Sequence, residues 1–307
     1  MKWLKTKRVS TFTREPYDGS PSWVVIGADR NDDPAALTRL ARELNSLTGT
    51  VFLFPPENDA DLYLRFFSSS GEMSFSSECT LAAYLGLEGE DLITFTEPTT
   101  LVRQKTKTGI QHLELRVKDK RVNRVTASLP VPQFISTPVD IKRIAHLLGV
   151  APIDILGSNY SVGVVALSGC TDIIVPLSSC DLLINTTPDF HQMKTYCETF
   201  QLTGIVAFCL ETKDPSNTAH MRYFAPAIGI NEDPVAGAAC AALGSYMLQN
   251  RIVPRGEVLT RIIVEHGHAV KRPGTVYVHV HTYKNNILKV TVGGQGVVTF
   301  TGTVLST

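Results

Sequence analysis

The most informative segment of the chain is Arg222-Tyr223-Phe224-Ala225-Pro226-Ala227-Ile228-Gly229-Ile230-Asn231-Glu232-Asp233-Pro234-Val235-Ala236-Gly237. It opens like a strand, with an arginine followed by two aromatic residues, and continues as an irregular loop that contains proline, glycine and acidic residues. A helix of small residues is predicted directly after it, from about Ala236 to Leu248. A strand, an acidic loop and a small-residue helix therefore form one motif here.

An earlier part of the chain repeats this order of elements. Arg65-Phe66-Phe67 matches Arg222-Tyr223-Phe224 at an offset of 157 residues (222 minus 65), about half of the 307-residue chain. A polar loop and a second small-residue helix follow, from about Thr80 to Leu85. The repeat indicates an internal duplication of the whole motif.

A duplicated helix start suggests a particular chemistry. If the two halves face each other, each helix brings free backbone N–H groups and the positive end of its dipole to one cleft, which suits a carboxylate or enolate oxygen. Glu78 and Cys79 precede the first helix, and Glu232 and Asp233 precede the second. The pattern therefore favours proton transfer beside a carboxyl or carbonyl group, with fixed dipoles stabilising the developing charge.

Strand-like segments outnumber helix-like ones, and several of them are adjacent, which predicts an α+β fold with mixed, mainly antiparallel sheets. Asp33-Pro34 is typical of a helix start, with an N-cap and a first-turn proline. Helices are expected near residues 34–44, 80–85, 140–148, 189–200 and 236–248. Strands are expected near residues 22–27, 51–54, 62–67, 92–95, 113–117, 124–129, 205–210, 221–224, 262–265, 276–281 and 288–292.

Composition excludes several classes of protein. Lys and Arg together number 29, as do Asp and Glu, so the zero formal net charge argues against nucleic acid or an acidic membrane as main partner. The N-terminus lacks the apolar stretch of a secretory signal, and no apolar run approaches the length of a bilayer span. Six scattered cysteines without a C-x-x-C pair indicate reduced thiols. A cytoplasmic globular protein is expected.

The segment from Arg222 to Gly237 resembles the R-x-F-x-P-x-x-G-x-x-E-D-P-A-T-G signature of the PhzF-like family, which comprises phenazine-biosynthesis isomerases and their relatives. Further similarity extends over nearly the whole chain, in Glu15-Pro16-Tyr17-Asp18-Gly19-Ser20-Pro21, Ala41-Arg42-Glu43-Leu44-Asn45, Phe52-Leu53-Phe54-Pro55-Pro56, Glu265-His266-Gly267, Arg272-Pro273-Gly274 and Gly293-Gly294.

This resemblance implies the diaminopimelate epimerase fold, in which two pseudo-symmetric lobes each wrap mixed, mainly antiparallel strands around a central helix. The lobes are expected at residues 1–130 and 131–293, and a return of the last strand, about residues 294–307, to complete the first lobe is left open. The resemblance further implies a homodimer, with no cofactor and no metal, acting on a small molecule in the cleft between the lobes.

The active-site motifs depart from the family pattern. The family's N-x-S-E-T glutamate falls on Gly49 when counted back from Phe52 and on Thr48 when counted forward from Asn45, because one residue is extra. Neither residue can act as a general base. The family's P-F-A-G-H-P loop has Glu78 in place of its histidine.

The second conserved loop of the family is changed as well. The D-P-A-T-G-S-A motif keeps Asp233 and Gly237, whereas its threonine and serine become Ala236 and Ala238. Asp233 is interpreted as an acid/base group or substrate anchor, although capping of the next helix is the simpler role. Glu78 is interpreted as a relocated proton carrier, against a plain dipole-compensating role.

Cys79 follows this glutamate and is either a thiol activated at a helix start or apolar filler. His279 and His281 have strand spacing but no evident carboxylate partner, so a solvated strand face is favoured over a metal site. The predicted catalytic residues are Asp233 and Glu78, and the predicted substrate-binding residues are Ser76, Ser77, Cys79, Gly237, Ala238, Gly19, Ser20, Thr48 and Gly49.

The sequence therefore predicts a PhzF-like, cofactor-independent isomerase of secondary metabolism with a small carboxylated or carbonyl-bearing substrate. Two alternatives stay open. The cleft could shape a reactive substrate for cyclisation, elimination or a pericyclic-type rearrangement without acid/base residues, or the chain could be a non-catalytic binding protein.

Overall fold

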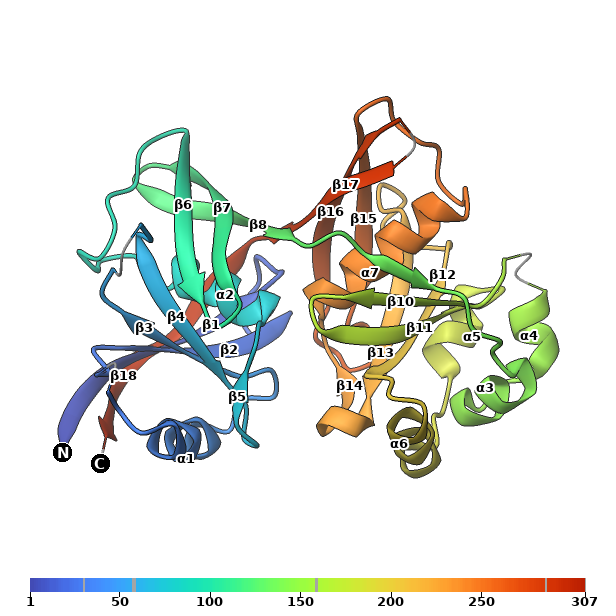
Figure 1. Cartoon of the computed structure of the whole chain (residues 1–307), viewed down its shortest axis with the longest axis horizontal. Coiled ribbons are helices and arrows are strands. Elements are labelled where there is room, and N and C mark those ends of the chain that lie inside the picture. Colours follow the sequence, from blue (N-terminus) through green and yellow to red (C-terminus); the bar gives the residue numbers. More distant parts are fainter. Residues whose placement is uncertain (30, 57–58, 158–159, 285, 307) are drawn as a thin grey trace. The chain divides into compact units, whose positions relative to one another are not determined.

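The computed structural model describes all residues except 30, 57–58, 158–159, 285 and 307. The chain divides into two compact units (Figure 1). The N-unit consists of residues 1–128 and 293–307, and the C-unit consists of residues 129–292. No helix among the described residues is long and apolar enough to cross a membrane.

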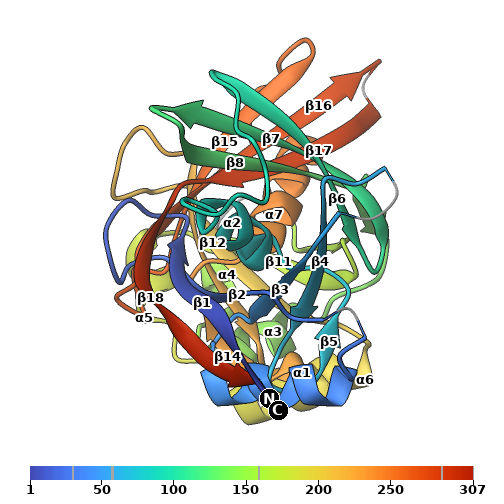
Figure 2. The same cartoon turned by 90° about the vertical axis from the view of Figure 1, so that its left-hand side faces the viewer.

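The N-unit is built mainly of strands. The helices among its described residues are α1 (Pro34–Leu44) and α2 (Ser77–Leu85). Its strands are β1 (Lys2–Thr11), β2 (Ser20–Ile26), β3 (Thr50–Phe54), β4 (Leu62–Phe67), β5 (Glu72–Met73), β6 (Thr99–Thr106), β7 (Gly109–Lys118), β8 (Arg121–Leu129) and β18 (Gly296–Ser306). The last strand, β18, lies antiparallel along β1, with Ser306 opposite Lys2 and Gly296 opposite Thr11 (Figure 2).

The C-unit contains more helices. They are α3 (Ile141–Leu148), α4 (Pro152–Leu156), α5 (Cys180–Asn185), α6 (Phe190–Thr199), α7 (Gly237–Gln249) and the 3-10 turn η1 (Pro226–Ile228). Its strands are β9 (Gln133–Ile135), β10 (Gly163–Leu167), β11 (Cys170–Pro176), β12 (Gly204–Cys209), β13 (Ala219–Ala225), β14 (Ile230–Asp233), β15 (Leu259–His266), β16 (Gly274–Tyr283) and β17 (Asn286–Gly294).

The two units share one order of strand pairing. In the N-unit, β2 pairs antiparallel with β1 and parallel with β3, and β4 pairs antiparallel with β3 and β5 but parallel with β6. In the C-unit, β11 pairs antiparallel with β10 and parallel with β12, and β13 pairs antiparallel with β12 and β14 but parallel with β15. The duplication predicted from the echo of Arg65-Phe66-Phe67 is therefore confirmed at the level of topology, as is the α+β class.

Each unit holds one buried central helix, as predicted. All nine residues of α2 are buried, and so are eleven of the thirteen residues of α7. Burial extends around all sides of both helices, which is the pattern of a helix enclosed by other elements rather than one lying on a surface. Figure 1 shows α2 among the strands of the N-unit, and α7 makes its most extensive contacts with β16 and β10.

The repeated arginines make equivalent contacts. Arg65 on β4 donates from Nε and Nη2 to both oxygens of Glu72 on β5, at 2.8 and 3.2 Å. Arg222 on β13 donates from Nε and Nη2 to both oxygens of Glu232 on β14, at 2.9 and 2.8 Å. Each guanidinium also lies over the phenylalanine two residues later in its strand, at 5.1 and 4.9 Å from the ring centroid. The R-x-F pattern thus encodes a clamp between the fourth and fifth strands of each repeat.

Helix starts follow their capping residues. Asp33 accepts a hydrogen bond from the backbone N–H of Ala35 and Pro34 is the first residue of α1, as the sequence predicts.

The strand expected near residues 92–95 is wrong, because these residues form a turn and a loop. Pro98 follows shortly and has no N–H for a ladder, and the N–H of Thr96 donates to the hydroxyl of Thr100 instead. The other strands expected from the sequence overlap observed ones.

Candidate functional site

The start of α2 carries the first cluster of predicted site residues. Ser76 is extended (φ −149°, ψ 122°) and caps the helix, because its Oγ accepts from the backbone N–H of Cys79 at 3.1 Å. The same hydroxyl donates to Oε2 of Glu78 at 2.9 Å, and the hydroxyl of Ser77 donates to Oε1 at 2.7 Å. Two neighbouring hydroxyls therefore hold both oxygens of the Glu78 carboxylate at the positive end of the α2 dipole.

Glu78 is a buried carboxylate, with 8% of its surface exposed. Dipole compensation alone, the simpler role considered for it, needs no burial and no pair of side-chain donors. Ser76 and Ser77 fix the orientation of the carboxylate, so the three residues act as one preorganised group. This geometry suits a proton acceptor or donor whose position is set before a substrate arrives.

The surroundings of Cys79 do not favour a role in proton transfer. Its side chain is completely buried, and burial raises the pKa of the Cys79 thiol to about 12. Its Sγ lies 4.0 Å from the backbone oxygen of Thr48. The structure therefore supports the reading of Cys79 as an apolar core residue rather than an activated thiol.

Thr48 and Gly49 lie against the same side of α2. The Thr48 hydroxyl donates to the backbone oxygen of Pro21 at 2.6 Å and lies 3.2 Å from the hydroxyl of Ser22. Gly49 has φ +128°, and a Cβ built there would lie 2.7 Å from Cε of Met73 and 3.2 Å from Sγ of Cys79. The backbone at this point favours glycine, so a side chain at position 49 would be strained and would crowd Met73 and Cys79.

Gly19 and Ser20 lie at the turn between β1 and β2. Gly19 has φ +59°, and a Cβ built there would lie 2.0 Å from the backbone oxygen of Thr11. The backbone oxygen of Ser20 accepts from the Thr11 hydroxyl at 3.1 Å, and its own hydroxyl is buried with no hydrogen-bond partner among the described residues. Pro21, the next residue, contacts Thr48, so this turn adjoins the cluster by its sequence position.

Asp233 is the candidate carboxylate of the C-unit. It is the last residue of β14, is 6% exposed, and accepts from the backbone N–H of Val235 at 3.0 Å. Its sequence neighbour Glu232 is bound at both oxygens by Arg222. Of the two acidic residues before α7, Glu232 is therefore part of the strand clamp, which leaves Asp233 as the candidate for chemistry.

Gly237 begins α7, and Ala238 follows it in the first turn. The N-cap residue Ala236 has no side chain that can cap the helix. Its backbone N–H donates to Nδ1 of His266 at 3.2 Å instead. His266 therefore performs from a distant strand part of the role that Ser76 performs locally in α2.

The sequence shows His266 only as part of the Glu265-His266-Gly267 motif and gives no signal of its role. It is completely buried, and burial lowers the pKa of its imidazole to about 3, so the ring is neutral. The next residue, Gly267, has φ +82°, and a Cβ there would lie 2.2 Å from the backbone oxygen of Arg272 and 2.5 Å from that of Pro234. The Glu265-His266-Gly267 segment thus packs directly against the loop that carries Asp233.

The structure therefore assembles the predicted residues into two groups, one in each unit. Ser76, Ser77, Glu78, Cys79, Thr48 and Gly49 come together around the start of α2, with Gly19 and Ser20 one or two residues from Pro21. Asp233, Gly237 and Ala238 come together at the start of α7. Among the described residues, no group of three or more His, Cys, Asp or Glu side chains could hold a metal ion.

Comparison with known proteins gives a family match over most of the chain. Residues 9–302 match the model of the PhzC-PhzF family, described as phenazine biosynthesis-like protein. An uncharacterized isomerase of Clostridium acetobutylicum is 27% identical over 296 residues, with 95% of each chain covered. The trans-2,3-dihydro-3-hydroxyanthranilate isomerase of Pseudomonas aeruginosa is 26% identical over 290 residues, with 94% of each chain covered.

The fold has a close counterpart among solved structures. The crystal structure of a Bacillus anthracis phenazine biosynthesis protein of the PhzF family aligns with a TM-score of 0.87 at 24% identity. The alignment covers 99% of this chain and all of that chain. At this identity the likeness is one of fold.

Proposed function

The chain belongs to the phenazine biosynthesis-like (PhzC-PhzF) family, whose curated members include isomerases, and on this premise we propose that it is a cofactor-independent isomerase that relocates a proton on a small carboxylated or carbonyl-bearing substrate. Glu78 and Asp233 are the proposed proton-transfer residues. The proposal requires that the starts of α2 and α7 serve one substrate in a cleft between the two units.

One observation carries this proposal. In a duplicated topology, each repeat places a buried carboxylate at the start of its central helix, Glu78 in the first turn of α2 and Asp233 four residues before α7. Burial of a carboxylate is costly unless it is hydrogen-bonded. Both carboxylates have donors that orient them, which are two hydroxyls for Glu78 and the N–H of Val235 for Asp233.

The proposed mechanism uses three groups of this chain. One carboxylate accepts a proton from a carbon next to the substrate's carboxyl or carbonyl group, and the electrons of the C–H bond form an enolate. Backbone N–H groups at the helix starts, with the positive ends of the helix dipoles, stabilise the enolate oxygen. The other carboxyl returns a proton to a different carbon, so the double bond moves and the substrate composition is unchanged.

The replacement of the family glutamate fits this assignment. A side chain at position 49 would be strained, and the hydroxyl of Thr48 donates to the backbone oxygen of Pro21. Thr48 is also not a titrating group near neutral pH. We propose that Glu78 supplies the carboxylate that position 48 or 49 supplies in the family pattern. Ser76, Ser77, Gly237, Ala238, Gly19 and Ser20 then bind the substrate or orient groups that do.

A second function is favoured by the same replacement. With glycine at position 49 and no carboxylate there, the site could bind and shape a reactive substrate for cyclisation, elimination or a pericyclic-type change without a general base. The two functions differ in one measurable respect, because only the first needs the titrating oxygens of Glu78 and Asp233. A non-catalytic binding protein would need neither turnover nor those oxygens.

The experiment compares amide variants on one substrate. Glu78→Gln and Asp233→Asn keep side-chain shape but remove the titration, and trans-2,3-dihydro-3-hydroxyanthranilate, the substrate named for the Pseudomonas relative, is the first probe. Each variant should lose roughly 10²- to 10⁴-fold in turnover, the usual contribution of general acid–base catalysis. Far-UV circular dichroism melts establish that each variant is folded.

Asp181→Asn provides a matched control, because Asp181 lies in the first turn of α5 and outside the proposed site. It should retain turnover. Retention of near wild-type turnover by both Glu78→Gln and Asp233→Asn would overturn the acid–base proposal and leave the shaping function.

We also propose a cytoplasmic homodimer that acts in secondary metabolism. The zero formal net charge places no repulsive barrier against self-association. Light scattering tests the dimer: a clean monomer of 33.6 kDa at working concentration would contradict it.

A further inference from the structure

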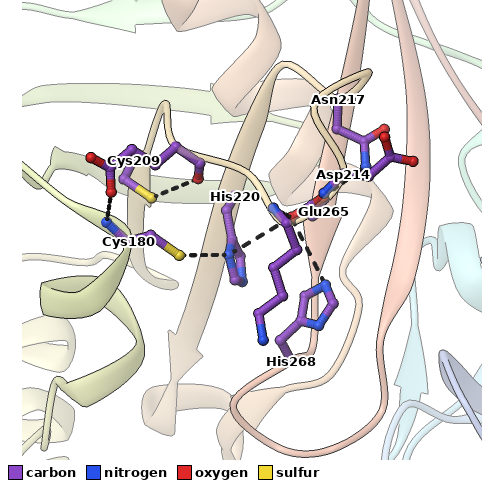
Figure 3. A network of polar contacts seen from close by, with 9 residues as sticks. Cys180, Cys209, Asp214, Asn217, His220, Glu265 and His268 are labelled. Carbon is purple, nitrogen blue, oxygen red and sulfur yellow. Dashed lines mark hydrogen bonds and ion pairs between the residues drawn. The ribbon is translucent and has the colours of Figure 1, made fainter.

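A thiol, an imidazole and a carboxylate meet in the C-unit outside the proposed proton-transfer residues. Cys180, the first residue of α5, places its Sγ 3.4 Å from Nδ1 of His220 on β13 (Figure 3). His220 is completely buried, whereas Cys180 is partly exposed. Of the six cysteines only Cys170 and Cys180 are partly exposed, and the other four are buried.

Glu265 fixes a negative charge beside the same imidazole nitrogen. Its Oε2 lies 3.9 Å from Nδ1 of His220. Three donors from one loop hold the carboxylate: the backbone N–H groups of Lys213 and Asp214, at 2.8 and 2.6 Å, and the amide of Asn217, at 2.8 Å. These hydrogen bonds lower the pKa of Glu265, although burial opposes them, so the group is ionised at neutral pH.

The resting pair is neutral. Burial lowers the pKa of His220 to about 4, so the ring is an unprotonated base at neutral pH. Burial also raises the pKa of Cys180, so its sulfur keeps its proton and can donate it to Nδ1. A thiol that rests in this form reacts only when a base takes its proton, and the base is already within hydrogen-bond reach.

Proton transfer to His220 would place the new positive charge between two negative groups. The thiolate would lie 3.4 Å from Nδ1 and the Glu265 carboxylate 3.9 Å from it. The Cys209 thiol also hydrogen-bonds Cys180 and favours its ionised form, and Lys213 acts in the same direction. Glu211 and Asp181 act in the opposite direction.

We propose that Cys180 is a covalent modification site for small conjugated carbonyl compounds, with His220 as its general base. The sulfur adds to the β carbon of the acceptor, so an S–C bond forms as the C=C π bond breaks. The thiol proton passes to Nδ1 of His220 and then to the α carbon, which restores the neutral imidazole. The addition needs no oxidant or further reactant.

The first test compares two thiols of the wild-type protein. Acrylamide, a small conjugated amide, is added at neutral pH to the reduced protein, and the alkylation rates of Cys180 and Cys170 are followed by peptide mass spectrometry. The same rates are measured in denaturant. In the unfolded chain both thiols should react at similar rates. In the native protein Cys180 should react faster than Cys170 by on the order of tenfold or more.

The outcome depends on whether folding makes Cys180 react faster or more slowly with acrylamide. A partly buried thiol without a base should react more slowly when native than when unfolded. Native Cys180 that reacts no faster than Cys170, or more slowly than unfolded Cys180, would overturn the proposal without any variant.

Two variants then test the base. Cys180→Ser should abolish the fast phase, and His220→Gln should reduce it to the rate of Cys170. Cys170→Ser is the matched control and should leave the fast phase unchanged. A folded His220→Gln protein that keeps the fast phase would refute the assignment of His220 as base.

Discussion

Replacing Arg222 by glutamine should destabilise the C-unit more than replacing Arg65 by glutamine destabilises the N-unit. Both arginines bind a glutamate at both oxygens, but their surroundings differ. The Arg222 and Glu232 side chains are 8% and 11% exposed, whereas those of Arg65 and Glu72 are 9% and 18% exposed. Water can therefore reach Glu72 more readily after its partner is removed.

Besides its ion pair with Glu232, Arg222 makes a second set of hydrogen bonds. Its Nη1 donates to the backbone oxygens of Leu183, Ile184 and Thr186, at 3.0, 3.2 and 2.9 Å. It thereby satisfies carbonyls at the end of α5. Loss of one partner of a buried ion pair costs roughly 3–5 kcal/mol. We expect about that for Arg222→Gln and roughly 1–3 kcal/mol for Arg65→Gln, close to the cost of one unsatisfied group.

Denaturant unfolding measures both values if the probes are separated. Trp3 and Trp23, the only tryptophans, lie in the N-unit, so tryptophan fluorescence reports that unit and far-UV circular dichroism reports both. The double variant Arg222→Gln/Glu232→Gln should be more stable than Arg222→Gln alone by roughly 1–2 kcal/mol, because it no longer buries the unpaired charge of Glu232. It should not reach wild-type stability, because the carbonyls at the end of α5 still lack the hydrogen bonds from Arg222. An Arg65→Gln cost equal to or above that of Arg222→Gln would refute this reasoning.

Three further perturbations follow from the same geometry. Ser76→Ala should lower the free energy of unfolding by about 1 kcal/mol and also reduce turnover, because Ser76 both caps α2 and holds Glu78. The control Ser179→Ala removes only a helix cap, so thermal melts should show a similar loss of stability and assays should show unchanged turnover. Gly49→Ala should lower the free energy of unfolding in urea by about 2–5 kcal/mol. Because the new Cβ meets the Met73 methyl, adding Met73→Ala should relieve about 1 kcal/mol of that cost in a double-mutant cycle. Burial raises the pKa of Asp172 from 3.8 to about 7, so between these pH values the folded state retains a proton that the unfolded state loses. The stability that this group contributes is therefore complete below about pH 4. It is lost as the pH rises to 7, by roughly 4 kcal/mol. Asp172→Asn should remove that part of the pH dependence of the unfolding free energy measured between pH 4 and 8, and an unchanged slope would contradict it.

Much of the fold was readable from local signals. The R-x-F echo at half the chain length predicted the duplication, and the small residues of 80–85 and 236–248 predicted central helices. The structure adds the reason why the echo recurs, because each arginine pairs with a glutamate on the neighbouring strand. The strand near residues 92–95 failed because apolar residues alone do not create a ladder partner. Several observed strands were missed, β9 to β11 among them. The three exposed residues of β9 pair with β10 across the segment that contains α3 and α4, whereas β10 and β11 form a local hairpin with Leu167 opposite Cys170.

The candidate site was only partly readable. Glu78 and Asp233 stand at helix starts, which sequence position reveals, and the serines before Glu78 are its immediate neighbours. His266 was not assigned because its contact with Ala236 spans 30 residues, and nothing in the local pattern signals a histidine that receives a helix N–H. The crowding that a side chain would meet at Gly49 depends on Met73 and Cys79, which only folding brings beside it.

The central claim is that this chain moves a proton through carboxylates at its two central helix starts. Turnover in D₂O tests it most directly, beginning with trans-2,3-dihydro-3-hydroxyanthranilate and extending to other small unsaturated, 2-amino and 2-hydroxy carboxylates, with mass spectrometry of the product. We predict incorporation of one solvent deuteron at carbon, lost in both Glu78→Gln and Asp233→Asn. Turnover that leaves the product free of deuterium and persists in both variants would contradict the claim.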